Sequence, residues 1–269
     1  MRWRCQGILV YFELENLLTQ DRQSSAYFIS DAHLGRNKLE IEERKQKYLI
    51  EFFHEVAKNG NYLFIVGDLF DFWFEWRWVI PKDTFPILAE LKSLVDCGIQ
   101  VHYLAGNHDF ELPGFLETEI GLAVHPNDLD IKISDTRFFI FHGDGILSRD
   151  KGYRLMKKII RHPWSVALYR LLHPDLGIAF AKLTSKMSHD HLSLKYSEKD
   201  EAENRDFALA MLRSGFDAVI MGHSHNPQIR QFPEGTYINL GDWMREFTYA
   251  VWDGNHLSLR KWPDKTEWQ

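Results

Sequence analysis

The sequence predicts an α/β fold in which helices cover a layered sheet or sandwich. Short apolar runs rich in β-branched and aromatic residues recur along the chain, and a cluster of polar residues follows each of them directly. Segments with apolar residues every three or four positions, the spacing of amphipathic helices, lie between these runs. Such alternation of strands and helices is typical of sheets covered by helices.

Six apolar runs have the length and composition of strands. They are Ala26–Ile29, Tyr62–Val66, Ile99–Leu104, Phe138–Phe141, Ala218–Met221 and Thr236–Leu240. Helical spacing predicts helices at Glu40–Lys58 and Thr84–Asp96. The strand pattern stops between residues 145 and 207, where helical, basic and aromatic segments take its place. We therefore expect one domain over residues 26–269 that is interrupted by an inserted helical cap, and an N-terminal extension of unknown role at residues 1–25.

The composition is that of a globular protein and gives no overall case for nucleic-acid binding. The 269 residues are 45% hydrophobic and 26% charged, and 32 Lys and Arg against 38 Asp and Glu give a net charge of −6. The two cysteines, Cys5 and Cys97, form no metal-binding or redox cluster. The run Gly7–Phe12 after Arg2 and Arg4 is too short for a signal peptide, so we expect a cytoplasmic protein.

Five polar clusters follow the expected strands. They are Asp31-Ala32-His33, Gly67-Asp68-Leu69-Phe70-Asp71, Gly106-Asn107-His108-Asp109, His142-Gly143-Asp144 and Gly222-His223-Ser224-His225. Strand ends in an α/β sheet commonly share one edge, so these clusters are expected to converge. In extended chain, two residues separated by one position, such as Asp31 and His33, point to the same side. Carboxylate, amide and imidazole ligands without Cys favour Mn²⁺, Fe, Zn²⁺ or Mg²⁺.

Each cluster taken singly also has an explanation without a ligand. Gly-Asp and Gly-Asn-His are common in turns, so Asp68 and Asn107 are alternatively turn or cap residues. His142 is alternatively a core histidine, and Asp71 a carboxylate at a helix N-terminus. Turn chemistry alone does not readily give five such clusters at five strand ends. The clusters together therefore favour a metal centre.

In residue type, order and spacing, the clusters resemble the signature of the calcineurin-like metallophosphoesterases. The resemblance implies a four-layer α/β/β/α sandwich with a dinuclear metal centre at the strand ends. It implies two divalent metal ions, expected to be Mn²⁺, with three residues on one ion, three on the other and one bridging. The resemblance places Asp31, His33 and His225 on the first ion. It places Asn107, His142 and His223 on the second ion, and Asp68 between the two.

The reaction implied by the resemblance is hydrolysis of a phosphoester by activated water. Two cations about 3.5–4 Å apart activate the water and hold the phosphoryl oxygens, so no protein nucleophile is needed. His108 is the candidate for the leaving oxygen, because an imidazole can donate a hydrogen bond or a proton there. Asp71 is implied to pair with His108 and to orient it.

The residues around the clusters resemble one branch of this family, the UDP-2,3-diacylglucosamine pyrophosphohydrolases of lipid A synthesis. The similarity includes the stretches Gly67–Trp73, Gly106–Phe110, His142–Tyr153, His162–Trp164 and Leu240–Trp243. It implies cleavage of the pyrophosphate of UDP-2,3-diacylglucosamine to UMP and 2,3-diacylglucosamine 1-phosphate. Asp150 and Tyr153 are implied to lie beside the glucosamine phosphate. Many members have Arg at the position of His108, which leaves the exact substrate open.

Residues 154–161 of the expected cap combine a cationic face with an apolar one. Arg154, Lys157, Lys158 and Arg161 share one side of a helix, and the remainder is Leu155, Met156, Ile159 and Ile160. A diphosphate-linked lipid requires cations and an apolar trough, so Lys157 and Arg161 join Asn107 as candidate substrate-binding residues. The same pattern suits a helix on an anionic membrane, and we expect peripheral contact with the inner membrane.

Two kinds of alternative stay open. The helix at 154–161 is alternatively packed on the core with a solvated basic face, and the apolar residues downstream are alternatively ordinary core: Trp164, Leu168, Leu171, Leu172, Ile178 and Phe180. The function is alternatively that of a phosphodiesterase or phosphatase acting on a nucleotide or another phospholipid. A scaffold protein without catalysis is disfavoured, because all seven expected ligands are present. The oligomeric state is not determined by the sequence.

Overall fold

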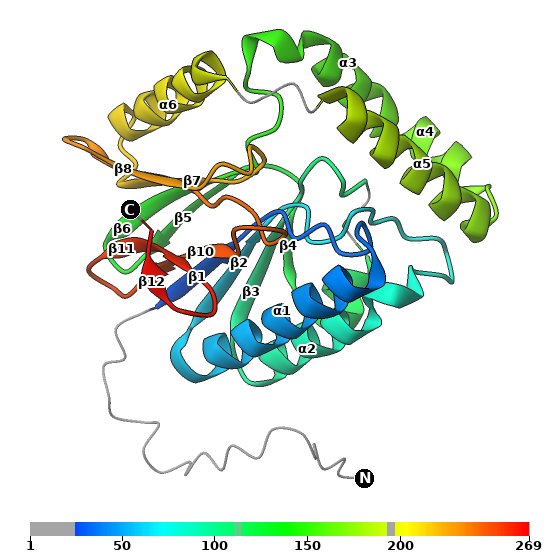
Figure 1. Cartoon of the computed structure of the whole chain (residues 1–269), viewed down its shortest axis with the longest axis horizontal. Helices are drawn as coiled ribbons and strands as arrows, with labels where there is room; N and C mark the ends of the chain where they lie inside the picture. The colour runs from blue at the N-terminus through cyan, green and yellow to red at the C-terminus, as the bar shows by residue number, and fades with distance from the viewer. Residues whose placement is uncertain (1–24, 111, 113, 193–196, 269) are drawn as a thin grey trace.

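Two β-sheets form the centre of the computed structural model, which describes residues 25–110, 112, 114–192 and 197–268 (Figure 1). The first sheet has the strand order β12-β11-β10-β1-β2-β3-β4, and the second has the order β5-β6-β7-β9-β8. The strands of the first sheet are β1 (Ala26–Ile29), β2 (Tyr62–Val66), β3 (Gln100–Leu104), β4 (Ala123–His125), β10 (Thr248–Trp252), β11 (Leu257–Lys261) and β12 (Thr266–Glu267). Those of the second are β5 (Leu129–Ile133), β6 (Thr136–Ile140), β7 (Ala218–Met221), β8 (Gln228–Phe232) and β9 (Gly235–Asn239).

Helices cover the outer face of each sheet and give four layers in the order α/β/β/α. Helices α1 (Leu39–Asn59) and α2 (Phe85–Asp96) pack on the first sheet, and α6 (Glu198–Arg213) packs on the second (Figure 1). In β1, Tyr27 and Ile29 face the helices, whereas Ala26 and Phe28 face the second sheet. This alternation follows from the two-residue period of a strand. The four-layer sandwich implied by the resemblance is confirmed.

The expected strands are all present, and three of them have the expected bounds. The other three begin or end one or two residues away, at β3, β6 and β9. The sequence analysis missed several strands, among them β5 and β11. Both carry charged residues at positions that are partly or fully exposed, so they lack a continuous apolar run.

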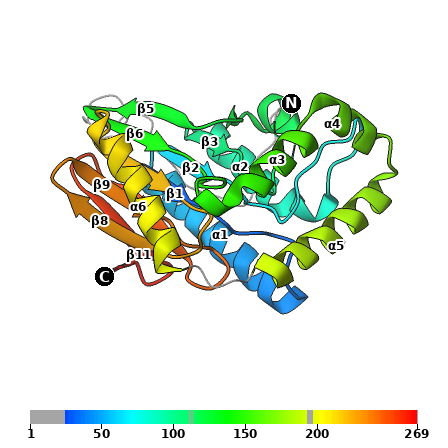
Figure 2. The same cartoon turned by 90° about the horizontal axis from the view of Figure 1, so that it is seen from above.

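Helices α3 (Lys151–Ile160), α4 (Pro163–Arg170) and α5 (Pro174–Leu192) lie over one end of the sandwich (Figure 2). An aromatic cluster joins α4 and α5 to the chain after β2, where Phe72, Phe74 and Trp76 pack with Tyr169. In addition, Trp76 Nε1 donates a hydrogen bond to the carbonyl oxygen of Leu172 at 3.1 Å. The division into one domain and an inserted cap stays a prediction, and residues 1–24 of the expected extension lie outside the described residues.

None of the helices in the described part of the chain has both the length and the apolar character needed to cross a membrane.

His102 of β3 is a half-buried titratable group outside the polar clusters. Its ring stacks on that of Phe64 with 4.7 Å between the centroids, and its Nδ1 lies 2.9 Å from Nε2 of His125. Burial, together with the neighbouring His125, lowers the pKa of His102 to about 4.

We expect His102 to lower the free energy of unfolding as the pH falls from 6.5 to 4. His102 takes up a proton near pH 6.5 when unfolded but only near pH 4 when folded, so protons favour the unfolded state between these values. The variant His102→Phe retains an aromatic ring against Phe64 and removes the titrating group. Urea unfolding in EDTA at pH 7 and pH 5 should show a larger loss for the wild type than for the variant. Equal losses would contradict this assignment.

Candidate metal centre

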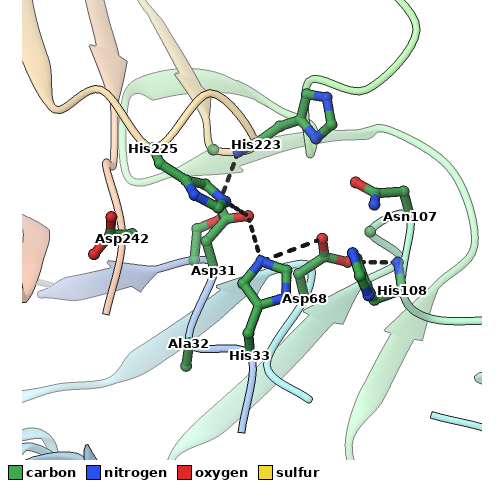
Figure 3. Close-up of polar contacts among 12 residues, drawn as sticks. Asp31, Ala32, His33, Asp68, Asn107, His108, His223, His225 and Asp242 are labelled. Carbon is green, nitrogen blue, oxygen red and sulfur yellow. Dashed lines mark hydrogen bonds and ion pairs between the residues drawn. The ribbon is translucent and has the colours of Figure 1, made fainter. Parts of the chain in front are cut away.

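The polar clusters of both sheets meet at one end of the sandwich, where the carboxyl ends of their strands lie together (Figure 3). The seven expected ligands follow five strands: Asp31 and His33 follow β1, Asp68 follows β2, Asn107 follows β3, His142 follows β6, and His223 and His225 follow β7. Atoms of five of these ligands and of His108 form overlapping groups within 4.8 Å, namely Asp31, His33 and His225; His33, Asp68 and His108; and Asp31, Asp68 and His142. The other two lie beside His142: Oδ1 of Asn107 is 3.0 Å from its Nε2, and the ring centroid of His223 is 5.1 Å from that of His142. The expected convergence is therefore present in the structure.

One half of the site is built around Asp31, which is completely buried. Its Oδ1 lies 3.1 Å from Nε2 of His225 and 3.5 Å from Nε2 of His33. Its Oδ2 accepts hydrogen bonds from the backbone N–H of His223, at 2.7 Å, and from the hydroxyl of Ser30. Oδ2 is thus fixed by the protein, and Oδ1 faces the two imidazoles.

The other half is built around Asp68. Its Oδ2 lies 3.3 Å from Nε2 of His142 and 3.8 Å from Nε2 of His33. Its Oδ1 accepts a hydrogen bond from the backbone N–H of His108 at 2.8 Å. Nε2 of His142 also lies 3.0 Å from Oδ1 of Asn107. Oδ2 of Asp68 therefore faces imidazoles of both halves, which is the placement required of a bridging ligand.

The backbone at five of these residues is left-handed. The φ angles are 55° at Asp31, 42° at His33, 54° at Asp68, 65° at His223 and 54° at His225. Our expectation that extended chain directs the paired side chains was therefore wrong. Left-handed backbone costs about 1–2 kcal/mol at each non-glycine residue and is typical of functional sites. The tight reversals bring both members of each pair to one site.

Two glycines of the clusters allow close approach of other chain segments to the carboxylates. A Cβ atom at Gly106 would lie 2.2 Å from Oδ1 of Asp68. A Cβ atom at Gly222 would lie 1.9 Å from Oγ of Ser30 and 2.6 Å from Oδ2 of Asp31. Any larger residue would have to displace a carboxylate. These glycines therefore serve the site and not only the turns.

The chemistry of the residues fits two divalent cations. Both ring nitrogens of His33 are buried and lack a hydrogen-bond partner among the described residues. Such buried polar atoms are rare because each is costly, so the ring is suited to a ligand. His142 presents Nδ1 to the carbonyl oxygen of Val66 at 2.9 Å, and a hydrogen bond there orients Nε2 as a metal ligand. Carboxylates, imidazoles and one amide form a donor set for Mn²⁺, Fe or Zn²⁺.

The carboxylates control the pKa of the imidazoles. Burial opposes the charge on His33, but Asp31 and Asp71 raise its pKa to about 9. Burial likewise opposes the charge on His142, and Asp68 and Asp31 raise its pKa to about 10. A site that holds protons this tightly favours positive charge. Divalent cations supply that charge and compete with the protons.

His108 and Asp71, the residues expected to form a catalytic pair, lie next to each other. Nδ1 of His108 lies 2.7 Å from the main-chain oxygen of Asp71 and 3.8 Å from its Oδ1. That Oδ1 lies 3.6 Å from Nδ1 of His33 and 3.9 Å from the guanidinium of Arg36. The closer contact of His108 with Asp71 is therefore to the main-chain carbonyl and not to the carboxylate. The alternative of a helix start at Asp71 is wrong, because the next helical segment begins at Lys82.

Sequence reasoning assigned no role to Asp109, whose buried carboxylate binds the backbone of two ligand loops. Its Oδ2 accepts hydrogen bonds from the backbone N–H groups of Asp68, at 3.0 Å, and Gly106, at 2.9 Å. Its Oδ1 accepts one from the hydroxyl of Tyr103 at 2.9 Å. Burial and the charge of Asp68 raise the pKa of Asp109 to about 6. The signal in the sequence that could have indicated this role was the position of Asp109 at the end of the cluster Gly106-Asn107-His108-Asp109.

Three of the expected substrate-binding residues, Tyr153, Lys157 and Arg161, contact the loops of this site. Tyr153 donates a hydrogen bond to Asp144 at 2.6 Å, and Lys157 forms an ion pair with the same carboxylate. Arg161 donates a hydrogen bond to the carbonyl oxygen of Asp109 at 3.0 Å. Asp150 occupies the N-cap position of α3, and its side chain makes no capping hydrogen bond. The structure thus ties the cationic face of α3 to the metal-binding loops, and sequence reasoning had assigned no role to Asp144.

The apolar face of α3 is exposed. Leu155 is 62% exposed and Ile159 is 58% exposed, and no residue of α3 is buried. The alternative of a helix packed on the core with a solvated basic face is therefore wrong. Downstream, Ile178 packs in the aromatic cluster, whereas Trp164 and Leu171 are exposed.

Comparison with known proteins defines the class of protein. Residues 25–227 match the family described as calcineurin-like phosphoesterase, and the chain belongs to this family. It is 31% identical over 261 residues to a UDP-2,3-diacylglucosamine hydrolase of Porphyromonas gingivalis, covering 90% of this chain and 99% of that protein. It is 26% identical over 226 residues to the protein of the same name from Haemophilus influenzae, covering 82% of this chain and 92% of that one. Vacuolar protein sorting 29 from Cryptosporidium parvum aligns at a TM-score of 0.45 and 14% identity, covering 92% of this chain and 95% of that chain.

We expect Gly106→Ala to weaken Mn²⁺ binding about tenfold or more. The new Cβ atom would lie 2.2 Å from Oδ1 of Asp68, so the carboxylate has to move. Titration calorimetry measures the affinity. Gly152→Ala is the matched control, since a Cβ atom there meets nothing within 4 Å. Equal Mn²⁺ affinity in both variants would mean that Asp68 is not a ligand.

Proposed function

We propose that this chain hydrolyses the pyrophosphate of UDP-2,3-diacylglucosamine to UMP and 2,3-diacylglucosamine 1-phosphate. The observation that carries the proposal is the convergence of the polar clusters next to α3, a helix with one cationic and one apolar face. Relatives named for this substrate match the chain over most of its length. The exposed apolar face suits an acylated substrate, which a simple nucleotide hydrolase would not require.

Two divalent cations, which we propose to be Mn²⁺, would lower the pKa of a water molecule and neutralise charge on the phosphate oxygens. The residues proposed to hold them are Asp31, His33 and His225 for one ion, Asn107, His142 and His223 for the other, and Asp68 between them. Metal binding requires neutral imidazoles, while His33 and His142 have raised pKa values of about 9 and about 10. The affinity for the cations is therefore expected to increase with pH.

His108 is the proposed acid for the leaving oxygen. Its Nδ1 faces the carbonyl oxygen of Asp71, which can only accept a hydrogen bond, so Nε2 is the nitrogen left to carry a transferable proton. The side chain is 19% exposed, which leaves it accessible to a substrate. Burial lowers the pKa of His108 and makes its imidazolium a stronger acid.

The substrate is proposed to lie between the metal centre and α3. Asn107, Asp150, Tyr153, Lys157 and Arg161 are the proposed substrate-binding residues. The contacts of Lys157 with Asp144 and of Arg161 with Asp109 support this, because they bring two cationic groups to the loops of the metal centre. Cations at this place suit the diphosphate of the substrate.

The exposed apolar residues favour peripheral contact with the cytoplasmic face of the inner membrane. Among the described residues, the large exposed apolar side chains of α3–α5 and the turn after α4 are Leu155, Met156, Ile159, Ile160, Trp164, Leu168, Leu171, Leu172, Leu176, Phe180 and Leu183. Trp78 is 85% exposed and lies two residues from Trp76, which bonds to the turn after α4. Such a patch with basic residues beside it suits an anionic lipid surface.

We expect the wild-type protein to release UMP from UDP-2,3-diacylglucosamine in the presence of Mn²⁺ and to stop when the metal is chelated. Bis(p-nitrophenyl) phosphate serves as the generic diester in parallel. Turnover of the generic diester alone would retain the metal-dependent hydrolase and contradict the lipid substrate.

Two variants separate the roles of the residues in the same assay. Asp68→Asn should lower metal content and rate together, because it removes the bridging carboxylate charge. His108→Ala should lower the rate about 10²–10⁴-fold with the metal retained, since it removes only the proposed acid. Full activity of His108→Ala would exclude that role.

The double variant Trp164→Asp, Leu171→Asp should bind vesicles of phosphatidylglycerol and phosphatidylethanolamine at least about tenfold more weakly than the wild type. Burial of either side chain in lipid is worth about 1.5–3 kcal/mol, and the added charges oppose it. Co-sedimentation measures the binding. Gln231→Asp, Asn255→Asp is the charge-matched control at exposed sites outside the cap. Equal binding by both double variants would refute contact through α4.

A further inference from the structure

A buried ion pair lies beneath the loop that carries His33. Lys45 and Glu42 are three residues apart on α1, and Nζ of Lys45 lies 2.9 Å from Oε1 of Glu42. Lys45 is completely buried and Glu42 is 7% exposed. Lysine is almost never completely buried, and a buried charge is costly even when it is paired. The proposed chemistry uses neither residue, so their burial requires another explanation.

The ammonium group of Lys45 binds the backbone of the loop. Its Nζ donates hydrogen bonds to the carbonyl oxygens of Ala32 and His33, each at 2.9 Å, and to Oδ1 of Asn37 at 3.0 Å. An apolar side chain of the same length would leave the carbonyl oxygen of Ala32 without this hydrogen bond, and that of His33 with only the backbone N–H of Arg36 at 3.3 Å. The charge thus satisfies backbone groups that the loop conformation turns inward.

The carboxylate of Glu42 binds the far end of the same loop. Its Oε2 accepts a hydrogen bond from the backbone N–H of Gly35 at 2.9 Å, and its Oε1 accepts one from that of Asn37 at 2.7 Å. Lys45 and Glu42 therefore hold residues 32–37 together, one through carbonyl groups and the other through N–H groups.

His33 is fixed on both sides of its peptide unit. Its N–H donates to the carbonyl oxygen of Asp68 at 3.0 Å, and its own carbonyl accepts from Lys45. The φ angle of His33 is 42°, a value that residues with a side chain rarely adopt unless their surroundings impose it. The contact with Lys45 is part of what imposes it.

We propose that Lys45, supported by Glu42, is a positioning residue that holds His33 in the backbone conformation required for metal binding. The affinity of the centre for its cation then depends on a side chain that does not contact the ion. This inference rests on the proposed metal centre and is independent of the lipid substrate.

The test is Mn²⁺ titration calorimetry on the full chain. Lys45→Met should weaken Mn²⁺ binding about tenfold or more, the usual effect of losing a group that orients a metal ligand. Lys47→Met is the matched control on the same helix, since Lys47 is 71% exposed, and it should bind Mn²⁺ as the wild type does. Glu42→Gln retains an acceptor oxygen and should weaken binding in the same direction by a smaller factor; this variant carries the test if Lys45→Met does not fold.

Thermal unfolding separates positioning from simple stabilisation. The rise in Tm that Mn²⁺ produces over EDTA should be smaller in Lys45→Met and Glu42→Gln than in Lys47→Met. A lower Tm in EDTA with unchanged Mn²⁺ affinity would overturn the inference and leave Lys45 as a structural residue. A wild-type chain that binds no Mn²⁺ would refute the metal centre itself.

Discussion

The buried carboxylates of Asp31 and Asp68 are the constraint on which the functional end of the molecule depends. A buried carboxylate is tolerated only when hydrogen bonds and positive charge surround it. Burial raises the pKa of Asp31, but His225 and His142 hold it well below its ordinary value, and Asp68 behaves in the same way. Backbone N–H groups from distant parts of the sequence also donate hydrogen bonds to these carboxylates, that of His223 to Asp31 and that of His108 to Asp68. The need to satisfy two charges therefore joins both sheets at one edge.

The sandwich supplies the rigidity that this arrangement requires. Each ligand loop begins at the end of a buried strand, and the strained left-handed residues lie immediately beyond it. Buried polar side chains hold these loops: Asp109 bonds the N–H groups of Asp68 and Gly106, and Lys45 bonds the carbonyl of His33. Local strain of this kind persists only where the surroundings determine the backbone. The fold and these side chains thus fix the backbone of the ligand loops, which is the support that a metal site requires.

Helix α3 has an unusual orientation for an amphipathic helix. An ordinary surface helix turns its apolar side to the core, whereas α3 turns its cationic side to the metal-binding loops and leaves its apolar side exposed. The contacts of α3 with Asp144 are polar, whereas the aromatic cluster around Trp76 holds α4 and α5. Cations and exposed apolar surface then lie on opposite sides of a single helix, the arrangement that our proposed acylated diphosphate substrate requires.

The sequence by itself determined the positions of six strands to within two residues and the seven candidate ligands that follow them, because local patterns of a few residues specify both. It also determined the four layers, through the resemblance that these ligands carry. Only the tertiary structure decided the left-handed backbone at Asp31 and His33, the role of the Asp71 carbonyl, and the contacts of Asp109 and Lys45. It also decided which face of α3 turns inward. Each of these depends on a partner distant in the chain, and the pattern around a residue does not specify which distant group will satisfy its charge.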